Sequence, residues 1–158
     1  MGLYLPLLCV LILLPISANV ATAAGPDPVG WLKFDDGACA VALDSSGSGK
    51  HGTIFGDPQW IAGQLDGALQ LDGTGDYVEL PIGPVIGALE EATLMLWVNW
   101  SGEGANWQRI LDLGSGTAHY LYLCPNNGST SAMPVAITVN NGVWNEFDSS
   151  AGLLPLGR

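Results

Sequence analysis

The sequence has few basic residues. Its 158 residues include four lysines and arginines against 15 aspartates and glutamates, which gives a formal net charge of −11. A protein that binds nucleic acid or an anionic membrane needs a patch of lysine and arginine to neutralise phosphates. We therefore expect no nucleic-acid partner and no membrane surface as a partner of the mature protein. An acidic surface suits neutral glycans, cations or basic protein surfaces, and it also serves solubility.

Charged residues of any kind are scarce, at 12% of the total, and no segment has a convincing helical pattern. The 22 glycines and 10 prolines separate short apolar runs, which is typical of short strands joined by tight turns. We predict an all-β fold. Its expected strands are residues 29–34, 51–55, 68–71, 76–80, 93–100, 109–113, 119–123 and 135–139. Residues 93–100 are apolar at both alternate sets of positions, which indicates a central strand covered on both faces.

The amino terminus lacks charge and contains an apolar stretch, residues 3–16, followed by small residues up to Ala24. This is the pattern of a cleaved signal peptide, although the segment before the stretch has no lysine or arginine. A retained membrane anchor is the alternative, and Pro6 and Pro15 argue against a long spanning helix. We predict a signal peptide over residues 1–23, a secreted location, and one domain over residues 24–158.

Cysteine is also scarce, since the chain has only Cys9, Cys39 and Cys124. Cys9 would leave with the signal peptide. In an oxidising compartment Cys39 and Cys124 can form a disulfide. Two free, buried thiols are an equal alternative, because the spacing carries no recognisable pattern.

Paired catalytic carboxylates are absent from the predicted strands. Glycosidases need two carboxyl groups that flank the cleaved bond, whereas Glu90 and Glu91 are adjacent and diverge in a strand. The two histidines, His51 and His119, have no serine or cysteine beside them in a nucleophile elbow. We therefore predict no catalytic residues and a non-catalytic role.

Six blocks in a fixed order carry a resemblance to a known family. They read GWLKFDD (30–36), ALDSSG with HGT (42–53), GQLDGALQLDG (63–73), DYV (76–78), TLMLWV (93–98) and WQRILDLG (107–114). With this succession the chain resembles the laminin G-like domains of the concanavalin A-like lectin/glucanase class. The resemblance implies a jelly-roll β-sandwich of two antiparallel sheets. It also implies further strands after residue 158, so we predict that the last strands are missing and that the chain is a fragment or a variant completed by a partner.

Aspartates at the ends of predicted strands are candidate metal ligands, because hard carboxylate oxygens on loops suit calcium. The candidates are Asp35, Asp36, Asp44, Asp72 and Asp76. The alternative is that these side chains cap turns. The family resemblance also implies calcium as an option, and we expect no other cofactor.

Aromatic residues supply the candidate ligand site, since their faces complement the apolar faces of sugar rings. We expect Trp31, Trp60 and Trp97 to pack in the core. The ligand candidates are Trp100, Trp107 and Trp144, which flank loops rich in glycine and asparagine, together with Tyr120 and Tyr122. Arg109 and Asp112 are expected to pair with each other. The function predicted is carbohydrate binding; the alternatives are a protein-interaction or adhesion domain and an accessory domain of a longer secreted glycoside hydrolase.

Overall fold

The chain is described from a computed structural model, which covers residues 27–37, 40–102, 106–115, 118–126, 133–138 and 145–148. Short strands dominate these residues. In chain order they are β1 (Val41–Ala42), β2 (Gly52–Phe55), β3 (Gln59–Ala62), β4 (Gly67–Gln70), β5 (Tyr77–Glu79), β6 (Leu111–Ser115), β7 (His119–Leu123), β8 (Pro134–Thr138) and β9 (Asn145–Asp148). The single-turn helix α1 (Gly83–Ile86) follows β5 and has Pro84 in its first turn.

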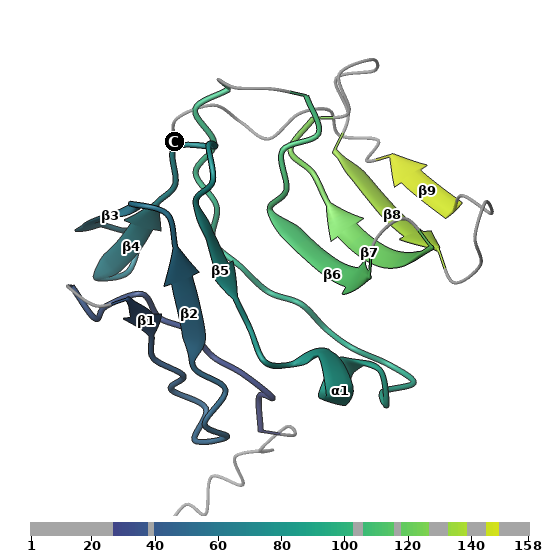
Figure 1. The fold of residues 1–158 in the computed structure, drawn as a ribbon, viewed down its shortest axis with the longest axis horizontal. Helices are drawn as coiled ribbons and strands as arrows, with labels where there is room; N and C mark the ends of the chain where they lie inside the picture. Colours follow the sequence, from purple (N-terminus) through teal and green to yellow (C-terminus); the bar gives the residue numbers. More distant parts are fainter. Residues whose placement is uncertain are drawn as a thin grey trace, which may run out of the picture.

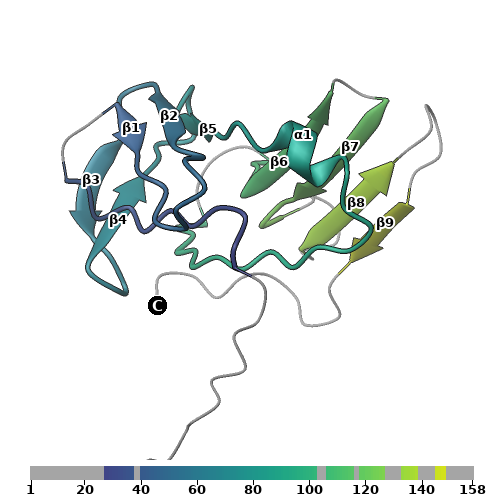
Figure 2. The ribbon, with the colours of Figure 1, turned by 90° about the horizontal axis from the view of Figure 1, so that it is seen from below.

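The strands form antiparallel sheets in the orders β1-β2-β5, β3-β4 and β6-β7-β8-β9. Figures 1 and 2 show the strands β1–β5 on one side of the molecule and the β6–β9 sheet on the other, with α1 between them. The protein is therefore an all-β sandwich, as predicted. The described residues divide into three hydrogen-bonded sheets, whereas the family resemblance implied two.

Ala42 on β1 is fully buried, and a cluster of buried residues lies on one face of the β6–β9 sheet. Tyr122 and Ala136 face each other across β7 and β8, and both are buried together with Cys124. The backbone N–H of Cys124 donates to the carbonyl oxygen of Pro134 at 3.1 Å, which continues the pairing beyond the end of β7. Alternate residues of β8 (Pro134, Ala136 and Thr138) are buried, as the two-residue repeat of a strand requires. The loop that contains residue 107 precedes β6 and is anchored on this sheet.

Six predicted strands are confirmed within a few residues: β2, β4, β5, β6, β7 and β8. The strands β1, β3 and β9 and the helix α1 were not predicted. The strand predicted at residues 29–34 is reduced to an isolated bridge between Leu32 and Asp44. Beside this bridge the Asp44 side chain accepts from the backbone N–H of Trp31, and the Trp31 carbonyl oxygen accepts from the N–H of Ser45 at 2.7 Å. A few separate contacts therefore hold this segment in place of a ladder of backbone pairs.

The predicted central strand over residues 93–100 is wrong. Residues 91–99 have no assigned secondary structure, and the exposed fraction reaches 90% for Met95 and 78% for Trp97. A strand that is apolar on both faces needs a paired neighbour and a covering layer on each side, and the described residues provide neither. The core roles expected for Trp97 and Trp31 are wrong as well, since Trp31 is 52% exposed. Trp60, on β3, is half-buried.

The described residues hold no helix with the length and apolar character needed to cross a bilayer.

Candidate functional site

Three of the predicted ligand residues come together at one end of the β6–β9 sheet. Tyr120 and Tyr122 lie on the same face of β7, with stacked rings whose centroids are 5.3 Å apart. Trp107, on the loop before β6, meets Tyr122 edge to face at 6.5 Å. Tyr122 is only 4% exposed, whereas Trp107 is 44% exposed. Trp107 is thus the member of this aromatic cluster that presents a ring to solvent, and the tyrosines support it.

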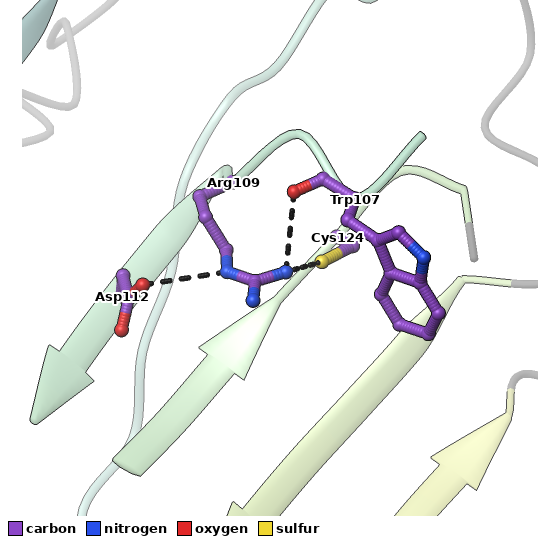
Figure 3. Close-up of polar contacts among 4 residues, drawn as sticks. All are labelled: Trp107, Arg109, Asp112 and Cys124. Atoms are coloured by element: carbon purple, nitrogen blue, oxygen red, sulfur yellow. Dashed lines mark hydrogen bonds and ion pairs between the residues drawn. The ribbon is translucent and has the colours of Figure 1, made fainter. Parts of the chain in front are cut away.

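Arg109 holds the aromatic cluster together, and Figure 3 shows its contacts with Trp107, Asp112 and Cys124. Its guanidinium lies over the Tyr122 ring, 3.8 Å from the centroid. Its Nη1 donates to the carbonyl oxygen of Trp107 at 3.2 Å and to the Sγ of Cys124 at 2.7 Å. Its Nε pairs with Asp112 at 3.3 Å, which confirms the expected ion pair. One planar side chain therefore connects the loop before β6, the face of β7 and the residue that follows β7.

Trp107 has a strained backbone. Its φ is +69°, a conformation that L-residues other than glycine rarely adopt. Its N–H donates to the carbonyl oxygen of Asn126 at 3.3 Å, while its carbonyl oxygen accepts from Arg109. Strain of this kind costs about 1–3 kcal/mol and persists where surrounding contacts fix the backbone, which is common at binding sites. The contacts to Asn126 and Arg109 supply that fixation here.

Cys124 is a free thiol in the structure, and it is fully buried beneath Arg109. Of the two alternatives for this residue, the free thiol is therefore the one observed; Cys39 lies outside the described residues. Burial raises the pKa of the Cys124 thiol, and the hydrogen bond from Arg109 opposes part of that rise. Burial likewise raises the pKa of Tyr122, with a further increase from Glu146. Both groups are therefore neutral at physiological pH and serve packing.

Trp100 and Gln108 extend the site towards a neighbouring turn. The indole N–H of Trp100 donates to Oε1 of Gln108 at 3.0 Å, and Trp100 is half-buried. The Nε2 of Gln108 lies 2.9 Å from the position that a Cβ on Gly73 would take. Gln108 thus reaches from Trp100 to the turn at residues 72–76. Gln108 was not among the predicted site residues, although its position directly after Trp107 could have indicated it.

The turn beside Gln108 carries a group of carboxylates. Oxygen atoms of Asp57, Asp72 and Asp76 lie within 4.8 Å of one another, which makes this a candidate cation site among the described residues. Asp76 accepts from the backbone N–H groups of Asp57 at 2.9 Å and of Asp72 at 3.0 Å. Gly56, with φ of +85°, leaves the room that Asp76 needs, since a Cβ there would collide with its carboxylate. Two of the predicted metal ligands are in this group, and Asp57 was missed.

The other three predicted metal ligands serve different loops. Asp44 accepts five hydrogen bonds, from the backbone N–H groups of Trp31, Ser46 and Lys50 and from the hydroxyl groups of Ser46 and Ser48. These donors hold the pKa of Asp44 far below its usual range, the Trp31 N–H contributing most. A carboxylate offers about four lone-pair positions, so none remains for a cation. Asp44 therefore orders the loop at residues 44–50, as the turn-capping alternative proposed.

Asp35 and Asp36 also act on backbone. Asp35 accepts from the N–H of Gly67 at 3.2 Å, and Asp36 accepts from the N–H of Leu43 at 3.0 Å. Neither belongs to the carboxylate group at the turn. The last aromatic candidate, Trp144, lies outside the described residues. A separate hollow of about 290 Å³ is lined by His51, Thr53, Glu79, Leu80 and Pro81, and it contains none of the predicted site residues.

Comparison with known proteins bears on the fold. No family model matches the chain, and no curated protein matches it in sequence. A solved structure of an S-layer domain-containing protein from Clostridium thermocellum is similar, with a TM-score of 0.65 and 22% sequence identity. The alignment covers 79% of this chain and 58% of that one, so the chain spans little more than half the length of its structural neighbour. At this identity the likeness shows the all-β sandwich fold alone.

Proposed function

We propose that this chain is a secreted, non-catalytic binding module of laminin G-like type, and that it holds a glycan against Trp107. The observation that carries the proposal is the geometry around this residue: a 44% exposed indole with a strained backbone, fixed by Arg109 and backed by Tyr122. A rigid aromatic face matches the apolar face of a pyranose ring, and rigidity limits the entropy lost on binding. Gln108 beside it supplies an amide that can bond sugar hydroxyl groups.

The carboxylates of Asp57, Asp72 and Asp76 are the part of the rim suited to calcium, since all three offer hard oxygen ligands. Bound there, the ion would neutralise repulsion among three acidic groups and order the turn that Gln108 contacts. The fit is incomplete, because Asp76 already accepts from two backbone N–H groups. We propose calcium as an ordering ion at this turn, and the residues around Trp107 would bind the ligand directly.

A secreted location is supported by the apolar leader at residues 3–16 and by the small residues that follow it. The structural neighbour, named for an S-layer domain, has the same fold. The acidic composition and the scarcity of lysine and arginine suit a neutral ligand.

A glycan array with the purified mature chain tests the proposal. We expect binding to at least one glycan class, lost in Trp107→Ala and retained in Trp31→Ala. Trp31 is the matched control because it is an exposed tryptophan on a segment remote in sequence, beneath Lys33. Silence on every glycan, or equal loss in both variants, would overturn the glycan proposal. It would leave the protein-interaction role as the working hypothesis.

A further inference from the structure

Residues 92–99 are an apolar segment that lacks backbone partners. Figures 1 and 2 draw the segment as a tube that joins α1 to the far end of the molecule. Within the described part of the chain, no hydrogen bond involves the backbone of these residues. Both sets of alternate side chains are exposed: Met95 and Trp97 strongly, and Leu94, Leu96 and Val98 to at least 39%. The segment therefore offers unpaired N–H and C=O groups together with apolar side chains on two faces.

We propose that residues 93–98 bind an extended strand of another protein by antiparallel β-pairing. An unpaired segment of this kind is a template for strand addition, in which main-chain hydrogen bonds give affinity and alternate side chains give specificity. Pairing would satisfy the backbone and cover Met95 and Trp97. All the strand pairs in the described sheets are antiparallel, so the same orientation is assigned to the added strand.

Charge identifies the chemistry of the occupant. Residues 92–99 carry no charge, but Glu90 and Glu91 stand exposed immediately before them. In an antiparallel pair, the carboxyl end of the added strand lies opposite these glutamates. Lysine or arginine at that end would be attracted, whereas a second copy of this chain would bring another net charge of −11. The occupant is thus an apolar strand followed by basic residues, supplied by a different protein. This surface ends two residues before Trp100, which bonds Gln108 at the edge of the glycan site, and it includes none of Trp107, Tyr120 and Tyr122.

The experiment uses the mature chain and three synthetic peptides with blocked termini. The first peptide has seven alternating valines and threonines followed by two lysines. The second replaces the lysines with glutamates. The third keeps the lysines but is N-methylated at alternate residues, which removes hydrogen-bond donors and leaves the side chains. Calorimetry gives the affinity, and tryptophan emission reports burial of Trp97 by comparison with Trp97→Phe.

We expect the first peptide to bind and to shift tryptophan emission to shorter wavelength in the wild type but not in Trp97→Phe. The N-methylated peptide should bind at least tenfold more weakly, and the glutamate peptide severalfold more weakly at low salt. The difference between lysine and glutamate peptides should shrink in the double variant Glu90→Gln, Glu91→Gln. Equal affinity for the N-methylated peptide, or no binding by any peptide, would overturn strand pairing.

Sedimentation velocity tests the alternative occupant, which is a second copy of this chain. A monomeric chain at micromolar concentration supports a foreign strand. A dimer that Met95→Asp abolishes would overturn this assignment in favour of a second copy, because that substitution places a charge on the most exposed side chain of the segment.

Discussion

The contacts of Arg109 make a quantitative prediction about the site. Its guanidinium lies over the largely desolvated Tyr122 ring, an interaction that contributes about 1–2 kcal/mol. Its hydrogen bond to the Trp107 carbonyl adds about 1 kcal/mol. The pair with Asp112 is partly exposed on both sides and adds less than about 1 kcal/mol. We expect Arg109→Ala to lower the free energy of unfolding by about 2–3 kcal/mol.

Urea unfolding followed by circular dichroism measures this loss, and Asp112→Asn is the matched control. Asp112→Asn removes only the exposed ion pair, so it should lower the free energy of unfolding by less than about 1 kcal/mol. Arg109→Lys keeps the positive charge but lacks the planar guanidinium group, so its loss of unfolding free energy should lie between those of Asp112→Asn and Arg109→Ala. A positioning role also predicts a changed near-ultraviolet spectrum in Arg109→Ala, because the packing of Trp107 on Tyr122 would loosen. If Arg109→Ala destabilises no more than Asp112→Asn, the account of the cluster is wrong.

Four further predictions concern individual side chains. The Cys124 thiol should react slowly with a thiol reagent in the native protein and fully in urea, because it is buried. Folding raises the pKa values of Cys124 and Tyr122, so the stability linked to their neutral forms is fully present at neutral pH. The free energy of unfolding, measured as a function of pH, should therefore fall above about pH 9. The pKa of Asp44 is lowered by folding, so its contribution is present above its ordinary value of 3.8, and the advantage of wild type over Asp44→Asn should decline as pH falls below that value. Calcium should raise the melting temperature of the wild type and not of Asp76→Asn; no shift in the wild type would remove calcium from the proposal.

The sequence predicted the strands whose pattern is local. Residues 119–123 and 135–139 alternate or carry β-branched side chains between turn residues, and both appear as strands within one residue of the expected limits. The short strand β1 lacks such a signal, since two residues cannot show a period. The strand β3 was missed because Gln59–Ala62 follows Pro58 and contains no alternating run. It forms because β4 pairs with it through four residues.

The site was predictable in its aromatic members and not in its polar connections. Tryptophans beside glycine-rich loops were the sequence signal for ligand candidates, and of these candidates Trp107 and Tyr122 do meet in the structure. The roles of Gln108 and Asp57 depend on contacts between different loops, Gln108 with the turn at Gly73 and Asp57 with Asp72 and Asp76, which no local pattern encodes. For Asp44, the capping alternative prevailed because five donors converge on one carboxylate.

The error at residues 93–100 has the same physical origin as the proposed strand-binding surface. An uninterrupted apolar run indicates that a segment can be buried on both faces. It does not identify the partners that would cover it, which lie elsewhere in the sequence or in another chain. The core beneath Tyr122 and Ala136 is local to the β6–β9 sheet and includes none of residues 92–99. The Trp107 site is built on that core. Glycan binding at Trp107 should therefore persist whether or not a strand occupies residues 93–98, and this independence allows each proposal to fail without the other.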